Sequence, residues 1–152
     1  MTVRRFIASG FGVGFIPRRL WGSDSGAGTF GAGLAALASL AVGWRPWWLH
    51  VGMFAIAVGL SVWASEPFSD DGADPGWIVI DEIAGTLVAL IGLTGWPWLV
   101  ALVVARAGDI TKALPGVAAA ERLHGPWGIT MDDVIAGLYG LAAGWAVYAV
   151  IG

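Results

Sequence analysis

Five acidic residues lie in or beside strongly apolar segments, and their carboxylates are the side chains best suited to chemistry. They are Asp81, Glu82, Asp109, Asp132 and Asp133. A charge at membrane depth costs at least ~2.5 kcal/mol on translocon-insertion scales, so five of them need compensation. A divalent cation with a few basic partners would supply it, and such a site suggests chemistry on a phosphate group.

Basic residues accompany one of the acids at helical spacing. Arg106, Asp109 and Lys112 stand three residues apart, so successive members lie on neighbouring helix surface. Arg106 and Lys112 could hold phosphate oxygens while Asp109 binds a metal ion. The structural alternative is an internal ion-pair ladder with snorkelling basic side chains.

A glycine-containing segment, His124-Gly-Pro-Trp-Gly128, precedes the pair Asp132-Asp133. The carboxylates offer hard oxygen ligands of the kind that Mg²⁺ takes. His124 could protonate a leaving oxygen or deprotonate water, although a loop histidine is often simply solvated. For the adjacent acids at 81 and 82, the structural alternative is a helix cap plus a solvated carboxylate.

The composition indicates a bilayer as the solvent of this chain. Of its 152 residues 57% are hydrophobic and 12% are charged, whereas soluble domains carry about 25% charged residues. The ten Trp residues favour membrane interfaces. The absence of Cys excludes disulfides, thiolate metal sites and a cysteine nucleophile. A net charge of −3 is not typical of nucleic-acid binding.

The apolar pattern predicts an all-α fold: a polytopic membrane helix bundle of about five membrane helices, forming one domain over residues 1–152. A membrane helix needs about 20 apolar residues. The predicted segments are Thr29–Val42, Trp47–Ala64, Trp77–Leu93, Trp96–Leu114 and Met131–Ile151. The stretch up to Ile16 is short and interrupted by Gly, which favours an N-terminal interfacial or re-entrant segment.

This threading predicts that the acidic residues meet at one membrane face. With the N-terminus in the cytoplasm, Arg45 is the basic residue that falls outside, as the positive-inside rule requires. The other seven fall on or toward the cytoplasmic side: Arg4, Arg5, Arg18, Arg19, Arg106, Lys112 and Arg122. The acids then lie at the cytoplasmic ends of the third, fourth and fifth helices.

Small residues point to close packing. Ala136, Gly140 and Gly144 repeat every four residues and predict a helix-packing stripe. The glycine-rich stretches 10–14 and 26–31 lack the Gly-Lys-Ser/Thr of a P-loop, so tight packing or a re-entrant turn is an equal interpretation. Thr29 would begin a helix, where backbone N–H groups could meet an anion.

These motifs resemble those of the bacterial phosphatidylglycerophosphatase A family in order and spacing. The matching elements are Gly10-Phe-Gly-Val-Gly14, Gly28-Thr-Phe-Gly31, Asp81-Glu-Ile-Ala-Gly85, Arg106-x-x-Asp109-x-x-Lys112 and His124-Gly-x-x-Gly128-x-x-x-Asp132-Asp133-x-x-Ala136-Gly137. The chain departs from the family pattern at Ala105, at Pro126, after Lys112, and in a longer stretch from Arg18 to Ala27.

The resemblance implies a magnesium-dependent, multi-pass phosphatase of the bacterial inner membrane with its active site facing the cytoplasm. It would hydrolyse phosphatidylglycerophosphate to phosphatidylglycerol and phosphate in phospholipid synthesis. The implied catalytic residues are Asp81, Asp109, His124 and Asp133. The implied substrate-binding residues are Thr29, Arg106 and Lys112. The implied Mg²⁺ ligands are Asp81, Glu82, Asp109, Asp132 and Asp133.

Two other functions fit intramembrane carboxylates less well. A small cation- or proton-coupled transporter would place its site near mid-membrane, with internal repeats that this sequence lacks. A phosphotransferase acting on a nucleotide-activated lipid would need an Asp-Gly pair upstream of Ala105-Arg106, and that pair is absent. The sequence leaves open the number of metal ions, the choice between water and aspartate as nucleophile, and the oligomeric state.

Overall fold

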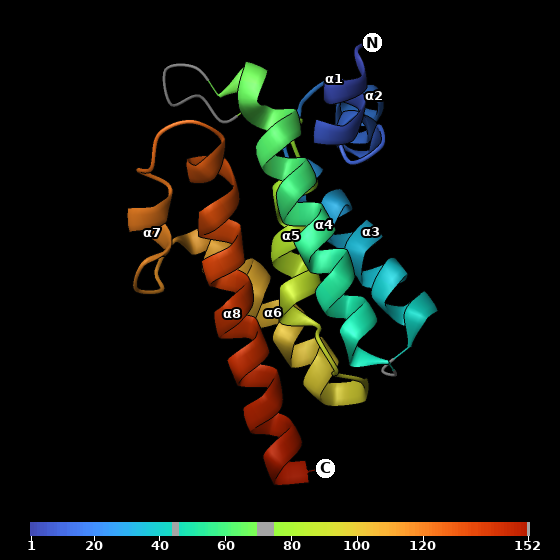
Figure 1. The fold of residues 1–152 in the computed structure, drawn as a ribbon, viewed down its shortest axis with the longest axis vertical. Coiled ribbons are helices and arrows are strands. Elements are labelled where there is room, and N and C mark those ends of the chain that lie inside the picture. Colours follow the sequence, from blue (N-terminus) through green and yellow to red (C-terminus); the bar gives the residue numbers. More distant parts are fainter. Residues whose placement is uncertain (44–45, 70–74, 152) are drawn as a thin grey trace.

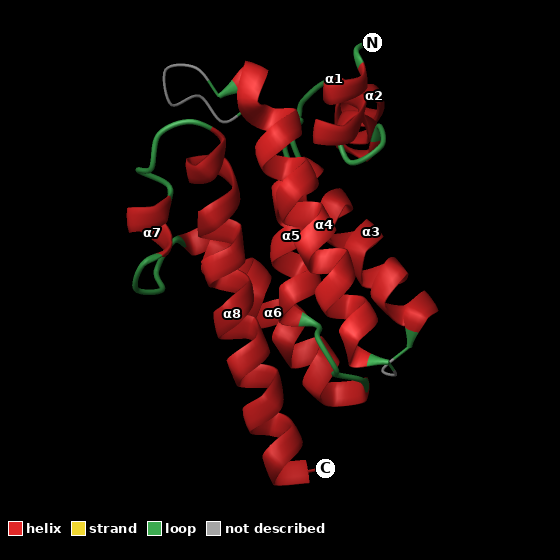
Figure 2. Ribbon diagram, viewed as in Figure 1, coloured by secondary structure: helices red, strands yellow, loops and turns green. Residues whose placement is uncertain are grey.

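The computed structural model describes residues 1–43, 46–69 and 75–151, and within these ranges every regular element is helical (Figures 1 and 2). The all-α prediction is therefore confirmed. In chain order the elements are α1 Val3–Ala8, η1 Val13–Phe15, α2 Ile16–Trp21, α3 Ala27–Val42, α4 Trp47–Ser65, η2 Glu66–Phe68, α5 Ile80–Ala89, α6 Gly95–Thr111, α7 Val117–Ala120 and α8 Pro126–Ile151. The predicted outside residue, Arg45, lies outside the described residues.

Among the described residues, two helices are long and apolar enough to cross a membrane. They are α4 continued through η2, Trp47–Phe68, and α8, Pro126–Ile151. Only 28% of the apolar stretch of each is buried inside the protein, so most of its surface faces outward. Outward-facing apolar helices are expected where lipid is the solvent. The count of about five membrane helices is not confirmed.

Helix α5 is short and enclosed. Its ten residues rise about 15 Å, roughly half of a bilayer's hydrocarbon thickness. Nine of the ten are buried, because α3, α4, α6 and α8 pack around it (Figure 1). The predicted segment Trp77–Leu93 thus contains a central core helix flanked by non-helical ends.

The small-residue stripe on α8 packs as predicted. A Cβ atom at Gly140 would lie 2.5 Å from the backbone oxygen of Ala101 on α6. One at Gly144 would lie 2.8 Å from the backbone oxygen of Pro97. These approaches let α6 and α8 pack backbone to backbone, and this packing brings the end of α6 beside the start of α8.

The N-terminal helices sit against the segment that leads into α5. The backbone N–H of Val79 donates to the carbonyl oxygen of Ala8 at 2.9 Å. Arg4 donates to Glu66 at 2.6 Å, which ties α1 to the end of α4. The chain turns sharply between α1 and η1, with positive φ at Gly10, Phe11 and Gly12. The interpretation of this region as an interfacial or re-entrant segment stays a prediction.

Candidate metal and phosphate site

Two acidic residues lie in the first turn of α5. Asp81 is only 2% exposed, so it is not the solvated carboxylate of the structural alternative. Glu82 is half-buried. The first turn of a helix favours negative charge, which offsets part of the cost of burying these groups.

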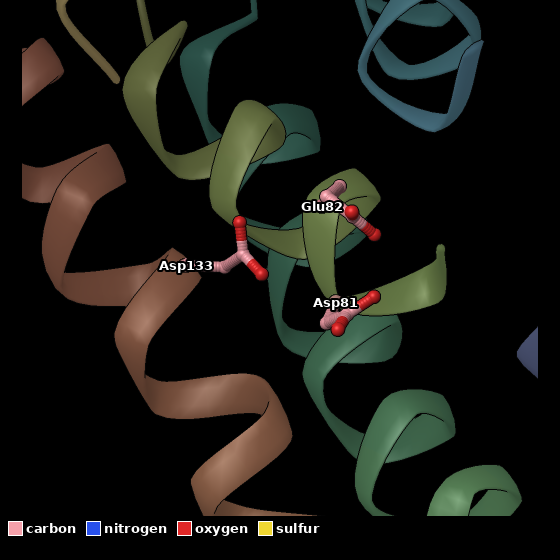
Figure 3. A group of neighbouring side chains, drawn as sticks. All are labelled: Asp81, Glu82 and Asp133. Atoms are coloured by element: carbon pink, nitrogen blue, oxygen red, sulfur yellow. The ribbon is translucent and has the colours of Figure 1, made fainter. Parts of the chain in front are cut away.

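Close packing of α5 and α8 brings a third carboxylate to the same place. A Cβ atom at Gly85 would lie 2.5 Å from the backbone oxygen of Asp133, and one at Gly137 would overlap the backbone oxygen of Gly85. Asp133 therefore reaches from α8 toward Asp81 and Glu82 (Figure 3). One oxygen from each of the three carboxylates lies within 4.8 Å of the others, so they could share one metal ion. We call this set the first carboxylate group.

A second carboxylate group shares one member with the first. It consists of Asp109 near the end of α6 and of Asp132 and Asp133 on α8, again with ligand oxygens within 4.8 Å of one another. Asp133 belongs to both groups. All five acidic residues singled out in the sequence therefore lie in one cluster, built from α5, α6 and α8.

Two basic residues pair mainly with the second group. Arg106 Nη1 donates to Asp109 Oδ2 at 2.7 Å and lies 3.9 Å from Asp133 Oδ1. Lys112 Nζ donates to Asp109 Oδ1 at 3.0 Å and also to Asp132. The ion-pair ladder considered for Arg106, Asp109 and Lys112 is thus present, and it extends to Asp132.

Lys112 directly follows the last residue of α6 and has an unusual backbone conformation. Its φ of 51° lies in the left-handed region, which few residues other than Gly adopt. The ion pairs with Asp109 and Asp132 stabilise Lys112 in this backbone conformation. Non-glycine residues in this region are typical of sites where the surrounding structure fixes a functional side chain.

The electrostatics of the cluster suit a bound cation. Five carboxylates face two basic side chains, and like charges in a buried site repel one another. Glu82 Oε2 and Asp132 Oδ1 are buried and accept no hydrogen bond from any residue that the structure describes. A buried charged oxygen left unsatisfied is destabilising, and coordination to a metal ion would satisfy it. The donor set, all oxygen, is the set that Mg²⁺ prefers.

Two of the residues predicted from the sequence make no hydrogen bond or ion pair with this cluster in the part of the chain that the structure describes. Thr29 is exposed in the first turn of α3, and its backbone N–H already donates to Gly26 at 3.0 Å. His124 is exposed ahead of α8. The described part of the chain shows no hydrogen bond or ion pair between His124 and the five acids. Their roles in substrate binding and proton transfer stay predictions.

Sequence reasoning missed the role of Gly28. A Cβ atom at this position would overlap Glu82 Oε1 and lie 3.0 Å from Arg106 Nη2. The absence of a side chain at Gly28 therefore makes room for both functional groups. The residue stands in the Gly28-Thr-Phe-Gly31 motif, but nothing in the sequence distinguishes it from the other 23 glycines as a neighbour of Glu82.

The fold and the site define an all-helical protein with a buried carboxylate centre beside an arginine and a lysine. The chain belongs to the phosphatidylglycerophosphatase A family, whose sequence model matches residues 6–148. The five acids and both basic residues of the cluster lie within this range.

Individual relatives agree with the family assignment. Phosphatidylglycerophosphatase A of Escherichia coli is 32% identical over 87% of this chain and 76% of its own length. A protein of Bacteroides thetaiotaomicron, named provisionally as a phosphatidylinositol-3-phosphatase, is 33% identical over 88% of this chain and 86% of its own length. Phosphatidylglycerophosphatase A of Haemophilus influenzae is 35% identical over about half of each chain, 49% and 47%. No solved structure gives a significant match.

Proposed function

We propose that this chain hydrolyses the phosphate monoester of phosphatidylglycerophosphate, releasing phosphatidylglycerol and inorganic phosphate. Family membership and the names of two relatives support the activity. The observation that carries the proposal is the cluster in which five carboxylates adjoin Arg106 and Lys112. Such a cluster can bind a cation and a phosphate side by side.

The cofactor in this proposal is Mg²⁺. Its first position is the carboxylate group of Asp81, Glu82 and Asp133, because most of the basic charge is directed at the other group. The second group, Asp109, Asp132 and Asp133, would take a second ion if Lys112 moved away. Bound Mg²⁺ would supply positive charge to the phosphoryl oxygens as negative charge develops on them.

Arg106 and Lys112 would hold the phosphate. Arginine suits forked contact with two phosphate oxygens, and lysine acts as a point charge. In the structure both are held at the edge of the cluster by Asp109, and Lys112 also by Asp132. Asp109 and Asp132 thus fix the positions of the Arg106 and Lys112 side chains in advance. These side chains then need not rearrange when the charged transition state forms.

Residues near the leaving oxygen would carry out the proton transfers. A carboxylate of the cluster or His124 would protonate it, and either water or an aspartate would be the nucleophile. His124 is exposed, so it would have to contact the part of the substrate that remains outside the cluster.

The protein would work in the membrane that holds its substrate. Two outward-facing apolar helices support membrane association. We propose the multi-pass arrangement in the bacterial inner membrane, with the carboxylate cluster at the cytoplasmic face. The acyl chains would stay in the lipid phase while the phosphate enters the cluster.

A second lipid phosphate is a candidate substrate because of the relative from B. thetaiotaomicron. Its name specifies phosphatidylinositol-3-phosphate, which is also a phosphate monoester on a lipid head group. The cluster recognises the phosphate itself, so selectivity depends on the rest of the head group. Both lipids therefore belong in the same assay.

The test is phosphate release by the purified chain in detergent, with each lipid at saturating concentration and with or without Mg²⁺. We expect Mg²⁺-dependent turnover of phosphatidylglycerophosphate that exceeds turnover of phosphatidylinositol-3-phosphate. Faster hydrolysis of the inositol lipid would reassign the substrate. No hydrolysis of either lipid with Mg²⁺ present would refute the proposal.

A further inference from the structure

A basic pocket lies on the N-terminal helices, apart from the carboxylate cluster. Its cavity of about 360 Å³ is lined by Met1, Arg5, Phe15, Arg18 and Arg19. We call it the N-terminal arginine pocket. The first 19 residues contain four of the chain's eight basic residues and no acid, although the whole chain has a net charge of −3. The pocket thus concentrates positive charge on an acidic protein.

Two of its arginines have no carboxylate partner in the described part of the chain. Arg5 lies over aromatic rings instead, with its guanidinium carbon 5.5 Å from the ring centroid of Phe15 and 5.1 Å from that of Trp77. Arg19 is exposed and enters no ion pair there. Arg18 pairs with Asp24 at 3.2 Å, but its side chain is still 59% exposed. The pocket therefore has unused capacity for an anion.

Exposed apolar side chains lie on the same short helices as the arginines of the pocket, and we call them the apolar rim. Val3 on α1 is 68% exposed, and Leu20 and Trp21 on α2 are 66% and 53% exposed. Arginines with adjacent Trp and aliphatic side chains are typical of segments that lie in the head-group region of a membrane. A site for a soluble anion would not need this apolar rim.

We propose that the N-terminal arginine pocket binds the phosphate of an anionic phospholipid head group, with the apolar rim in contact with the acyl chains. Anionic lipids attract juxtamembrane basic residues by about 1 kcal/mol each, which is about fivefold in affinity per arginine. This inference does not depend on the proposed hydrolysis, because it uses different residues.

The pocket is joined to the segment that positions Asp81. Phe15 stacks on Trp77 with ring centroids 5.4 Å apart, and Val79 donates its N–H to Ala8. Residues 77–79 lead directly into α5. A lipid held in the pocket would therefore contact Arg5 and Phe15, and both of these residues contact Trp77 in the segment that leads into α5.

The experiment measures lipid binding to the full chain in a neutral detergent. Native mass spectrometry would count bound phosphatidylglycerol and phosphatidylcholine and give their relative affinities. The variants are R19Q, R18Q/R19Q and, as a control, R122Q, which removes an exposed arginine elsewhere in the chain. D81N is included to identify any phosphatidylglycerol bound at the carboxylate cluster.

We expect the wild type, R122Q and D81N to retain phosphatidylglycerol in preference to phosphatidylcholine. R19Q should weaken phosphatidylglycerol binding about fivefold, and R18Q/R19Q about 25-fold. Arg19 makes no hydrogen bond or ion pair with any residue that the structure describes, so the R19Q result stands even if the double variant folds poorly. Equal binding of the two lipids, or wild-type affinity in R19Q, would overturn the proposal. So would displacement of the lipid by an equal concentration of inorganic phosphate.

Discussion

Asp133 is the residue on which the two carboxylate groups depend. It belongs to both groups, it is buried, and Arg106 Nη1 lies 3.9 Å from its Oδ1. Asp81 and Glu82 serve only the first group, and Asp109 and Asp132 only the second. The consequences of removing a charge should therefore differ between positions, even though all five residues are acidic neighbours.

The first prediction concerns the carboxylate charges. D81N and D133N keep the size of the side chain and remove one negative charge each, so each should lower kcat at least ~100-fold. D133N should be the more severe because it affects both groups. The measurement is phosphate release at saturating lipid and Mg²⁺. E121Q, which changes an exposed acid, should keep wild-type turnover; wild-type turnover in D81N and D133N would refute the assignment.

The second prediction concerns Gly28. G28A would place a methyl group against Glu82 and Arg106 and should lower kcat at least ~10-fold, since small misplacements of catalytic groups are costly. G33A is the matched control: it lies on the same helix with nothing within 4 Å of the added Cβ atom. The measurement is kcat of G28A and of G33A under the same conditions. Equal activities would show that the position tolerates a side chain.

At the scale of the elements, the apolar runs predicted α3, α4 and α6 to within three residues at each end, whereas α8 begins at Pro126 and not at the predicted Met131. The sequence could not show that α5 is short, because an apolar residue enclosed by protein looks the same as one facing lipid. Helix α5 begins only at Ile80, after Val79 has paired its N–H with Ala8. That hydrogen bond joins residues far apart in the sequence, so the residues around Val79 do not by themselves indicate where the helix begins.

The part of the candidate site that could be predicted from the sequence is the set of acidic residues, because charged residues stand out in apolar segments. All five acids were found in this way. The pairing of Lys112 with Asp132 was not, because it depends on how α6 packs against α8. The exposure of His124 was not predictable either, because its glycine-rich neighbourhood permits several loop conformations.

The third prediction concerns the packing of α6 against α8. G140A would place a methyl group 2.5 Å from a backbone oxygen of α6, which forces the helices apart and should cost about 1–3 kcal/mol of stability. Thermal unfolding in detergent measures the effect as a lower Tm. G59A on α4 has open space around the added atom and should leave the Tm unchanged or slightly higher. A G140A Tm equal to that of G59A would contradict this packing role.

At the scale of the whole molecule, the carboxylate cluster joins three helices from different parts of the chain. The repulsion among its charges opposes that joining, and a cation would relieve it. Stability and metal binding should therefore be linked, since a ligand that binds only the folded state stabilises it.

The fourth prediction follows from this linkage. Mg²⁺ at about 100 times its dissociation constant should stabilise the folded chain by about 2.7 kcal/mol, and excess chelator should remove this effect. Thermal unfolding with and without Mg²⁺ measures it. D133N should lose most of the Mg²⁺ response, whereas R19Q should keep it. A wild-type Tm that does not respond to Mg²⁺ would argue against a cation in the cluster.

The contact between Gly85 and Gly137 has an implication for how such sites are recognised. Neither residue has a functional group, yet their touching backbones set the width of the gap between Asp81 and Asp133. A chain that kept every carboxylate but carried alanine at either position would hold the same charges at a wider separation. A count of acidic residues would then overestimate its ability to bind a metal ion, because the separation of the carboxylates depends on the absence of side chains at Gly85 and Gly137.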